Sequence, residues 1–160
     1  MWRATKWGLK RARASLGAAA FLLLGALPAQ ASAKLAHPFE FTLARVAEMM
    51  NLELRPGIAP PALQYQSTTP LKKFQDTLEP QWGFRPDAFT NAYSWGSNEI
   101  FLMDDEAYYQ TEGRCIDDSL AHELVHFFQV RYRGYDLTKD EFAELEAVDL
   151  QTRYRAQYCR

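Results

Sequence analysis

Two histidines one helical turn apart, with a glutamate directly after the first, form the pattern in this sequence that is most able to carry out chemistry. They lie in the segment His122-Glu123-Leu124-Val125-His126. Residues four apart share one face of a helix, so both imidazoles can bind one ion while Glu123 orients a water molecule. Imidazole nitrogens at this spacing suit Zn²⁺. The pattern therefore predicts a zinc site with Glu123 as the general base.

A catalytic zinc ion usually takes a third protein ligand and leaves one position for water. The remaining histidine, His37, is far away in the sequence and is expected to be an ordinary surface residue. The C-terminal segment instead offers a series of acids, namely Asp140, Glu141, Glu144, Glu146 and Asp149. Glu146 shares a helix face with Phe142 and Leu145, which we expect to be the apolar face, so Glu146 is the preferred third ligand. Glu144 and Asp149 are the alternatives.

Residues close to the ligands are expected to orient them. Asp149, about one turn after Glu146, is placed to accept the second ring N–H of a histidine. Gln129 follows His126 by about one turn and either supports the site or packs in the core. The charge that develops on a substrate carbonyl oxygen needs a further donor. Several residues remain open for that role: Tyr132, Tyr135, Tyr154, Arg131 and Arg153.

Two helices are predicted to position these residues. The first covers about 118–132 and stops at Gly134, and the second opens at a capping box of Thr138 and Glu141 and runs almost to the C-terminus. A loop this short predicts antiparallel packing. Cys115 and Cys159 then lie at the same end of the helix pair. A disulfide between them is therefore predicted, and zinc ligation by their thiols is disfavoured.

The preceding part of the chain predicts some strand. A helix is expected over 39–50, a Pro-rich loop around a short strand at 62–66, and a short helix over 71–78. In the aromatic segment that follows, 93–95 and 99–103 are expected to pair as strands and to turn at 96–98. The predicted fold class is α+β: a mostly helical domain with a small antiparallel sheet and an HExxH helix antiparallel to the C-terminal helix.

The stretch from His122 to Gln129, with Glu146-Ala147 and Gln151 further on, resembles the zincin metallopeptidases. More narrowly it resembles the gluzincins, whose third ligand is a glutamate on the following helix, and it is similar to small exported bacterial zincin-like domains. The resemblance implies zinc-dependent hydrolysis of peptide bonds in a peptide or protein substrate.

The same resemblance implies a role for the strand at 99–103. This strand would be the edge of the sheet along the cleft, where an extended peptide can add as a further strand. A buried core strand is the alternative, because Ile100-Phe101-Leu102-Met103 is continuously apolar.

The first 33 residues predict an export signal. They contain cations and no acid, an apolar run from Ala14 to Leu27, and two A-x-A patterns that end at Ala31 and Ala33. The run is shorter than the ~20 residues of a membrane span. We therefore expect a signal peptide over 1–33, a zincin-like domain over 34–160, no stable membrane anchor after cleavage, and a periplasmic or secreted protein. A net charge of −2 without a basic stripe argues against a nucleic-acid partner.

Two other functions fit the same sequence. A zinc-binding structural or interaction domain would carry the site without catalysis, and a chain this short leaves little room for the second lobe that usually walls a protease cleft. A metal-free helical scaffold would instead bind a partner through the aromatic segment from Trp82 to Trp95.

Overall fold

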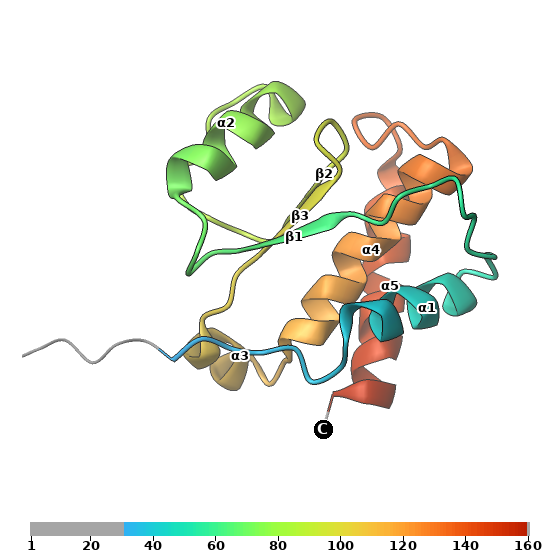
Figure 1. Cartoon of the computed structure of the whole chain (residues 1–160), viewed down its shortest axis with the longest axis horizontal. Coiled ribbons are helices and arrows are strands. Elements are labelled where there is room, and N and C mark those ends of the chain that lie inside the picture. The colour runs from blue at the N-terminus through green and yellow to red at the C-terminus, as the bar shows by residue number, and fades with distance from the viewer. Residues whose placement is uncertain (1–30, 160) are drawn as a thin grey trace, which may run out of the picture.

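The computed structural model describes residues 31–159 and contains, in that range, helices around one small sheet (Figure 1). The elements in chain order are α1 (Phe39–Met49), β1 (Ala62–Tyr65), α2 (Leu71–Trp82), β2 (Ala92–Ser94), β3 (Glu99–Leu102), α3 (Glu106–Glu112), α4 (Ile116–Arg133) and α5 (Glu141–Tyr158). The predicted fold class, a mostly helical α+β domain, is confirmed.

The sheet is mixed, with the strand order β1-β3-β2. β2 pairs antiparallel to β3 as expected, but β1 joins β3 in parallel, so the expectation of a purely antiparallel sheet is wrong. The strand predicted at 99–103 is the central one. The expectation that it forms the edge along the cleft is therefore also wrong, and β2 is the free edge on that side.

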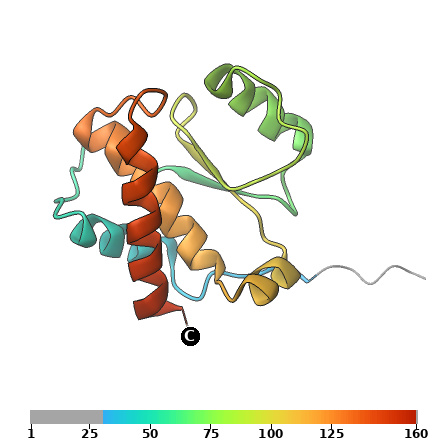
Figure 2. The ribbon, with the colours of Figure 1, turned by 180° about the vertical axis from the view of Figure 1, so that it is seen from behind.

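The continuous apolar run of β3 reflects burial on both faces of the sheet. Ile100 and Leu102 belong to the main core with α4, whereas Phe101 packs with Phe74 and Leu78 of α2. Figures 1 and 2 show α2 on one side of the sheet and α4 with α5 on the other. Side chains of a strand alternate between faces, so a strand between two helical layers must be apolar throughout.

Helix α2 extends one turn further than the sequence predicts. It continues through Pro80 to Trp82 and ends where Gly83 takes a positive φ of 73°. A proline lacks the amide hydrogen that would bond back along the helix, so one bond of the last turn is missing, yet the turn persists. This extra turn brings Gln81 up to β2.

Helices α4 and α5 pack antiparallel. The buried stripe of α5 consists of Ala143, Ala147, Leu150 and Tyr154, all at most 4% exposed. At the start of α4 and the end of α5, Cys115 and Cys159 form the predicted disulfide with a Cα–Cα distance of 5.9 Å. α5 begins at Glu141 and is capped by Asp140, whose side chain accepts the amide of Phe142, whereas the predicted capping residue was Thr138.

The N-terminal part of the described chain runs along α3 and α4. Residues 1–30, which include most of the predicted signal peptide, lie outside the described range, and Ser32 forms a β-bridge with Asp105. His37 is not an ordinary surface residue, because its Nδ1 lies 3.2 Å from the buried Asp117 carboxylate and its ring stacks on Phe41.

Within residues 31–159, no helix is both long and apolar enough to cross a bilayer. The disulfide is consistent with an oxidising compartment outside the cytoplasm.

Removing the disulfide tests how far it holds the two helices together. The bridge spans a sequence separation of 44, which on the chain-entropy model stabilises the fold by about 4 kcal/mol. The double variant Cys115→Ala/Cys159→Ala should lose about that free energy of unfolding in urea titrations followed by circular dichroism. A loss below ~1 kcal/mol would show that helix packing alone fixes the pair.

Candidate metal centre

Helix α4 presents both histidines on its exposed side toward a cleft, because its other faces are anchored in the core. Leu120, Leu124 and Phe128 are fully buried, while the side chains of His122 and His126 retain 15% and 13% exposure. Their Nε2 atoms lie 3.1 Å apart. Two ring nitrogens so close and facing each other are suited to a shared cation.

The third group at this point is Glu144 of α5. Its carboxylate oxygens lie 3.4 Å from His122 Nε2 and 3.2 Å from His126 Nε2. The two imidazoles hold the pKa of Glu144 well below its usual range, through hydrogen bonds from His122 and then His126. Burial disfavours the His126 cation, but Glu144, Glu123 and Gln129 together outweigh burial and raise the pKa of His126.

The structure does not place Glu146, the predicted third ligand, in this cluster. Its carboxylate accepts hydrogen bonds from Arg133 at 2.7 Å and from Gln129 at 3.0 Å, and it does not reach the imidazoles. The error lies in the choice of helix face. Phe142 and Leu145, which were expected to be buried, are 76% and 65% exposed. Glu144 and Glu146 flank the true buried stripe on opposite sides, about 160° apart around the helix.

Gln129 lies directly behind His126 and is fully buried. Its Nε2 donates to the Ala143 carbonyl at 2.8 Å and to Glu146, so both amide hydrogens are used. Its Oε1, 2.8 Å from His126 Nδ1, must then be the acceptor of a ring N–H. This contact places a proton on Nδ1 of His126, so the neutral ring carries its lone pair on Nε2, the nitrogen that faces the cluster.

Asp149 does not support a histidine, contrary to expectation. Its side chain is 68% exposed and lies 3.6 Å from Arg153. Among the described residues, the buried Nδ1 of His122 has no hydrogen-bond partner. The two imidazoles are therefore supported unequally, and His126 is the one whose orientation is fixed.

Glu123 lies beside the cluster and is 4% exposed. Burial raises the pKa of its carboxyl group, and the neighbouring His122 and His126 offset part of that rise. The nearby Tyr93 backbone also favours the charged form and so lowers this pKa slightly. Glu123 and Tyr93 line the same cleft.

The donor set fits a zinc ion. Bonds of ~2.0–2.2 Å in a tetrahedral arrangement set ligand atoms about 3.3–3.6 Å apart, close to the separations found among His122, His126 and Glu144. These three residues form one of two groups in the described chain that could hold a metal. In the second group, Cys115 and Cys159 are bonded to each other, and Asp118 pairs with Arg114 at 2.6 Å. These side chains therefore have a structural role.

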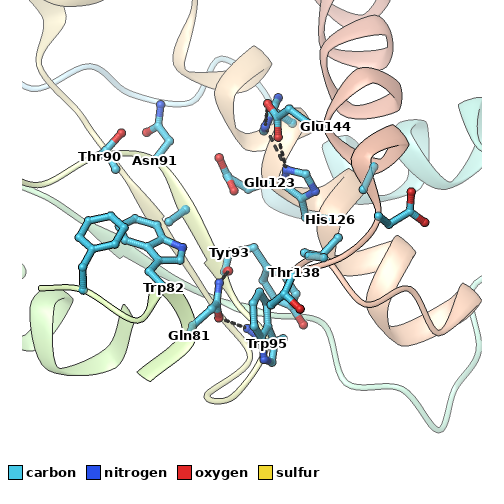
Figure 3. A pocket seen from close by; sticks show the side chains of 16 residues that line it. Gln81, Trp82, Thr90, Asn91, Tyr93, Trp95, Glu123, His126, Thr138 and Glu144 are labelled. Atoms are coloured by element: carbon cyan, nitrogen blue, oxygen red, sulfur yellow. Dashed lines mark hydrogen bonds and ion pairs between the residues drawn. The ribbon is translucent and has the colours of Figure 1, made fainter. Parts of the chain in front are cut away.

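The cluster opens into a cleft of about 770 Å³ (Figure 3). Helices α4 and α5 and the loop between them line one wall with the three candidate ligands, Glu123 and Thr138. The opposite wall comes from the end of α2 and from β2 with its flanking residues, namely Gln81, Trp82, Phe84, Thr90, Asn91, Tyr93 and Trp95. The sheet with α2 therefore supplies the second wall that the chain length seemed too short to provide.

The five residues left open as oxyanion donors are all described, and none lines this cleft. The fully buried Tyr154 bonds Thr42 of α1, and Tyr132 accepts the amide of Arg55. Arg131 bonds the Tyr93 hydroxyl and the Trp95 carbonyl. Arg153 lies near Asp149, and the Tyr135 amide donates to the Gln129 carbonyl.

In the comparisons with known proteins, no family model, curated protein or solved structure matches this chain.

The two glutamates of α5 allow a direct test of the third ligand. Because Glu144 faces the imidazoles and Glu146 faces Arg133, Glu144→Gln should weaken zinc binding by about 100-fold or more. Glu146→Gln keeps its hydrogen-bonding shape and should change zinc affinity by less than ~10-fold. Competition with a chromophoric chelator measures both affinities, and the opposite ranking would restore Glu146 as the ligand.

The contact behind His126 predicts a second effect. Gln129→Leu removes the acceptor of the Nδ1 proton and should lower zinc affinity by about 10–100-fold while filling the same space. The matched control is Gln151→Leu, because Gln151 also joins α5 to α4 but bonds Asp118, away from the cluster. Equal zinc affinities in the two variants would argue against a role for Gln129 in orienting the ligand.

Proposed function

We propose that this protein is an exported zinc-dependent peptidase that hydrolyses peptide bonds. The observation that carries the proposal is the meeting of His122, His126 and Glu144 within 3.4 Å of one another, with Glu123 beside them, in one wall of an open cleft. Three nitrogen and oxygen donors with open space in front are typical of catalytic rather than structural zinc sites.

Each residue has a distinct task in this mechanism. His122, His126 and Glu144 would hold Zn²⁺, which would polarise a carbonyl and make a water molecule nucleophilic near neutral pH. Glu123, buried beside these residues, would accept the proton of the attacking water and pass it to the leaving amine. Gln129 keeps the His126 ring in the tautomer that a metal requires.

The form of the cleft favours a peptidase over a structural zinc domain. Structural zinc sites usually have four protein ligands and are closed to solvent. Here the described residues offer three candidate ligands, and all three line an open cleft. A cleft of this volume can enclose several side chains of a peptide.

The expected location follows from two features. The predicted signal peptide at 1–33 and the disulfide both fit a periplasmic or secreted protein. The substrates would then be peptides or proteins outside the cytoplasm.

Glu123→Gln tests the proposal. The variant should bind one zinc ion as tightly as the wild type within a few-fold, and its cleavage of a peptide library should fall at least ~100-fold, because the general base is lost. Glu112→Gln, an exposed acid at the end of α3, is the matched control and should cleave normally. Undiminished cleavage by Glu123→Gln would remove Glu123 as the base, and zinc binding without any cleavage by the wild type would favour the structural domain.

A further inference from the structure

The outer edge of β2 borders the cleft and is where an extended substrate would be expected to add. Its backbone groups are already bonded by side chains of the protein itself. Gln81 Nε2 donates to the Tyr93 carbonyl at 2.9 Å, and the Trp95 amide donates to Gln81 Oε1 at 3.1 Å. One side-chain amide thus makes the pair of hydrogen bonds that a residue of an added strand would make.

Another outward group of this edge is also hydrogen-bonded. The Trp95 carbonyl accepts a hydrogen bond from Arg131 at 2.7 Å. An unpaired strand edge is a site for unwanted pairing, and such edges are commonly covered. Gln81 does so inside the cleft, between Trp82 and Trp95 (Figure 3).

The two side chains that bond this edge are not held equally. Arg131 also bonds the Tyr93 hydroxyl. Gln81 is half-buried at the C-terminal end of α2, and its two amide contacts are both to the β2 edge. Of the groups on this edge, the Gln81 amide is the one that can rotate away without disturbing the candidate ligands.

We propose that the Gln81 amide is an intramolecular cap on the edge of β2, which the backbone of an extended peptide displaces when it enters the cleft. This inference rests on the proposed peptidase function and concerns its substrate class. A substrate must offer a carbonyl and an amide in extended conformation to replace the two lost bonds. The cap therefore selects extended peptides over compact ones and over those too short to pair.

The experiment compares Gln81→Ala and Gln81→Asn with a matched control, Gln64→Ala, in the zinc-loaded protein with Glu123→Gln to prevent turnover. Gln64 lies on β1, at the opposite edge of the sheet, and bonds Glu99. Hydrogen exchange of the Trp95 amide, measured by NMR, reports on the cap without any substrate. Binding of a capped hexapeptide reports on displacement of the Gln81 amide. The peptide consists of alanines with two central phenylalanines, chosen to contact Trp82, Phe84 and Trp95 in the cleft.

We expect Trp95 exchange to accelerate at least ~5-fold in both Gln81 variants and the hexapeptide to bind about 10-fold more tightly, because two competing hydrogen bonds are absent. Gln64→Ala should change neither quantity.

Unchanged or weaker peptide binding in the Gln81 variants, or no binding to any variant, would overturn the proposal. If the hexapeptide binds as expected while the wild type cleaves no peptide, the proposed role of Gln81 is supported and the peptidase function is contradicted. If peptides are cleaved but the Gln81 variants bind the hexapeptide like the wild type, only the proposed role of Gln81 is contradicted.

Discussion

The close antiparallel packing of α4 and α5 is the constraint on which the site depends. Two alanines, Ala143 and Ala147, lie on the buried stripe of α5 and allow the helices to approach closely. The rotation of α5 that buries this stripe brings Glu144 to the imidazoles and Glu146 to Arg133. The disulfide holds the far end of the same pair. The candidate ligands are therefore set by helix packing rather than by a flexible loop.

The sheet contributes the other half of the cleft. Because β3 is buried on both faces, the sheet is fixed between α2 and α4 with little freedom to shift. Its edge strand β2 lines the cleft together with Glu123 and is hydrogen-bonded by Gln81 of α2. The candidate base and ligands therefore face the same cleft as the strand edge that Gln81 covers.

Sequence reasoning reached the HExxH residues, the helix pair and the disulfide, because each depends on local spacing or on the geometry of two straight helices. The prediction of the third ligand and of a supporting role for Asp149 failed because α5 carries apolar residues on more than one face. Phe142 and Leu145 suggested a buried face that is in fact exposed. The parallel pairing of β1 with β3 and the hydrogen-bonded edge of β2 could not be predicted from the sequence either. Both result from contacts between segments far apart in the sequence, such as Gln81 with Trp95, which no local pattern encodes.

The central claim is that two imidazoles and one carboxylate share a zinc ion. X-ray absorption at the zinc edge of the metal-loaded protein tests it most directly, because it reports the ligand types in solution. The account predicts scattering from two imidazole rings, nitrogen and oxygen neighbours at ~2.0–2.2 Å, and no sulfur. Sulfur neighbours at ~2.3 Å, or a spectrum without imidazole scattering, would contradict it.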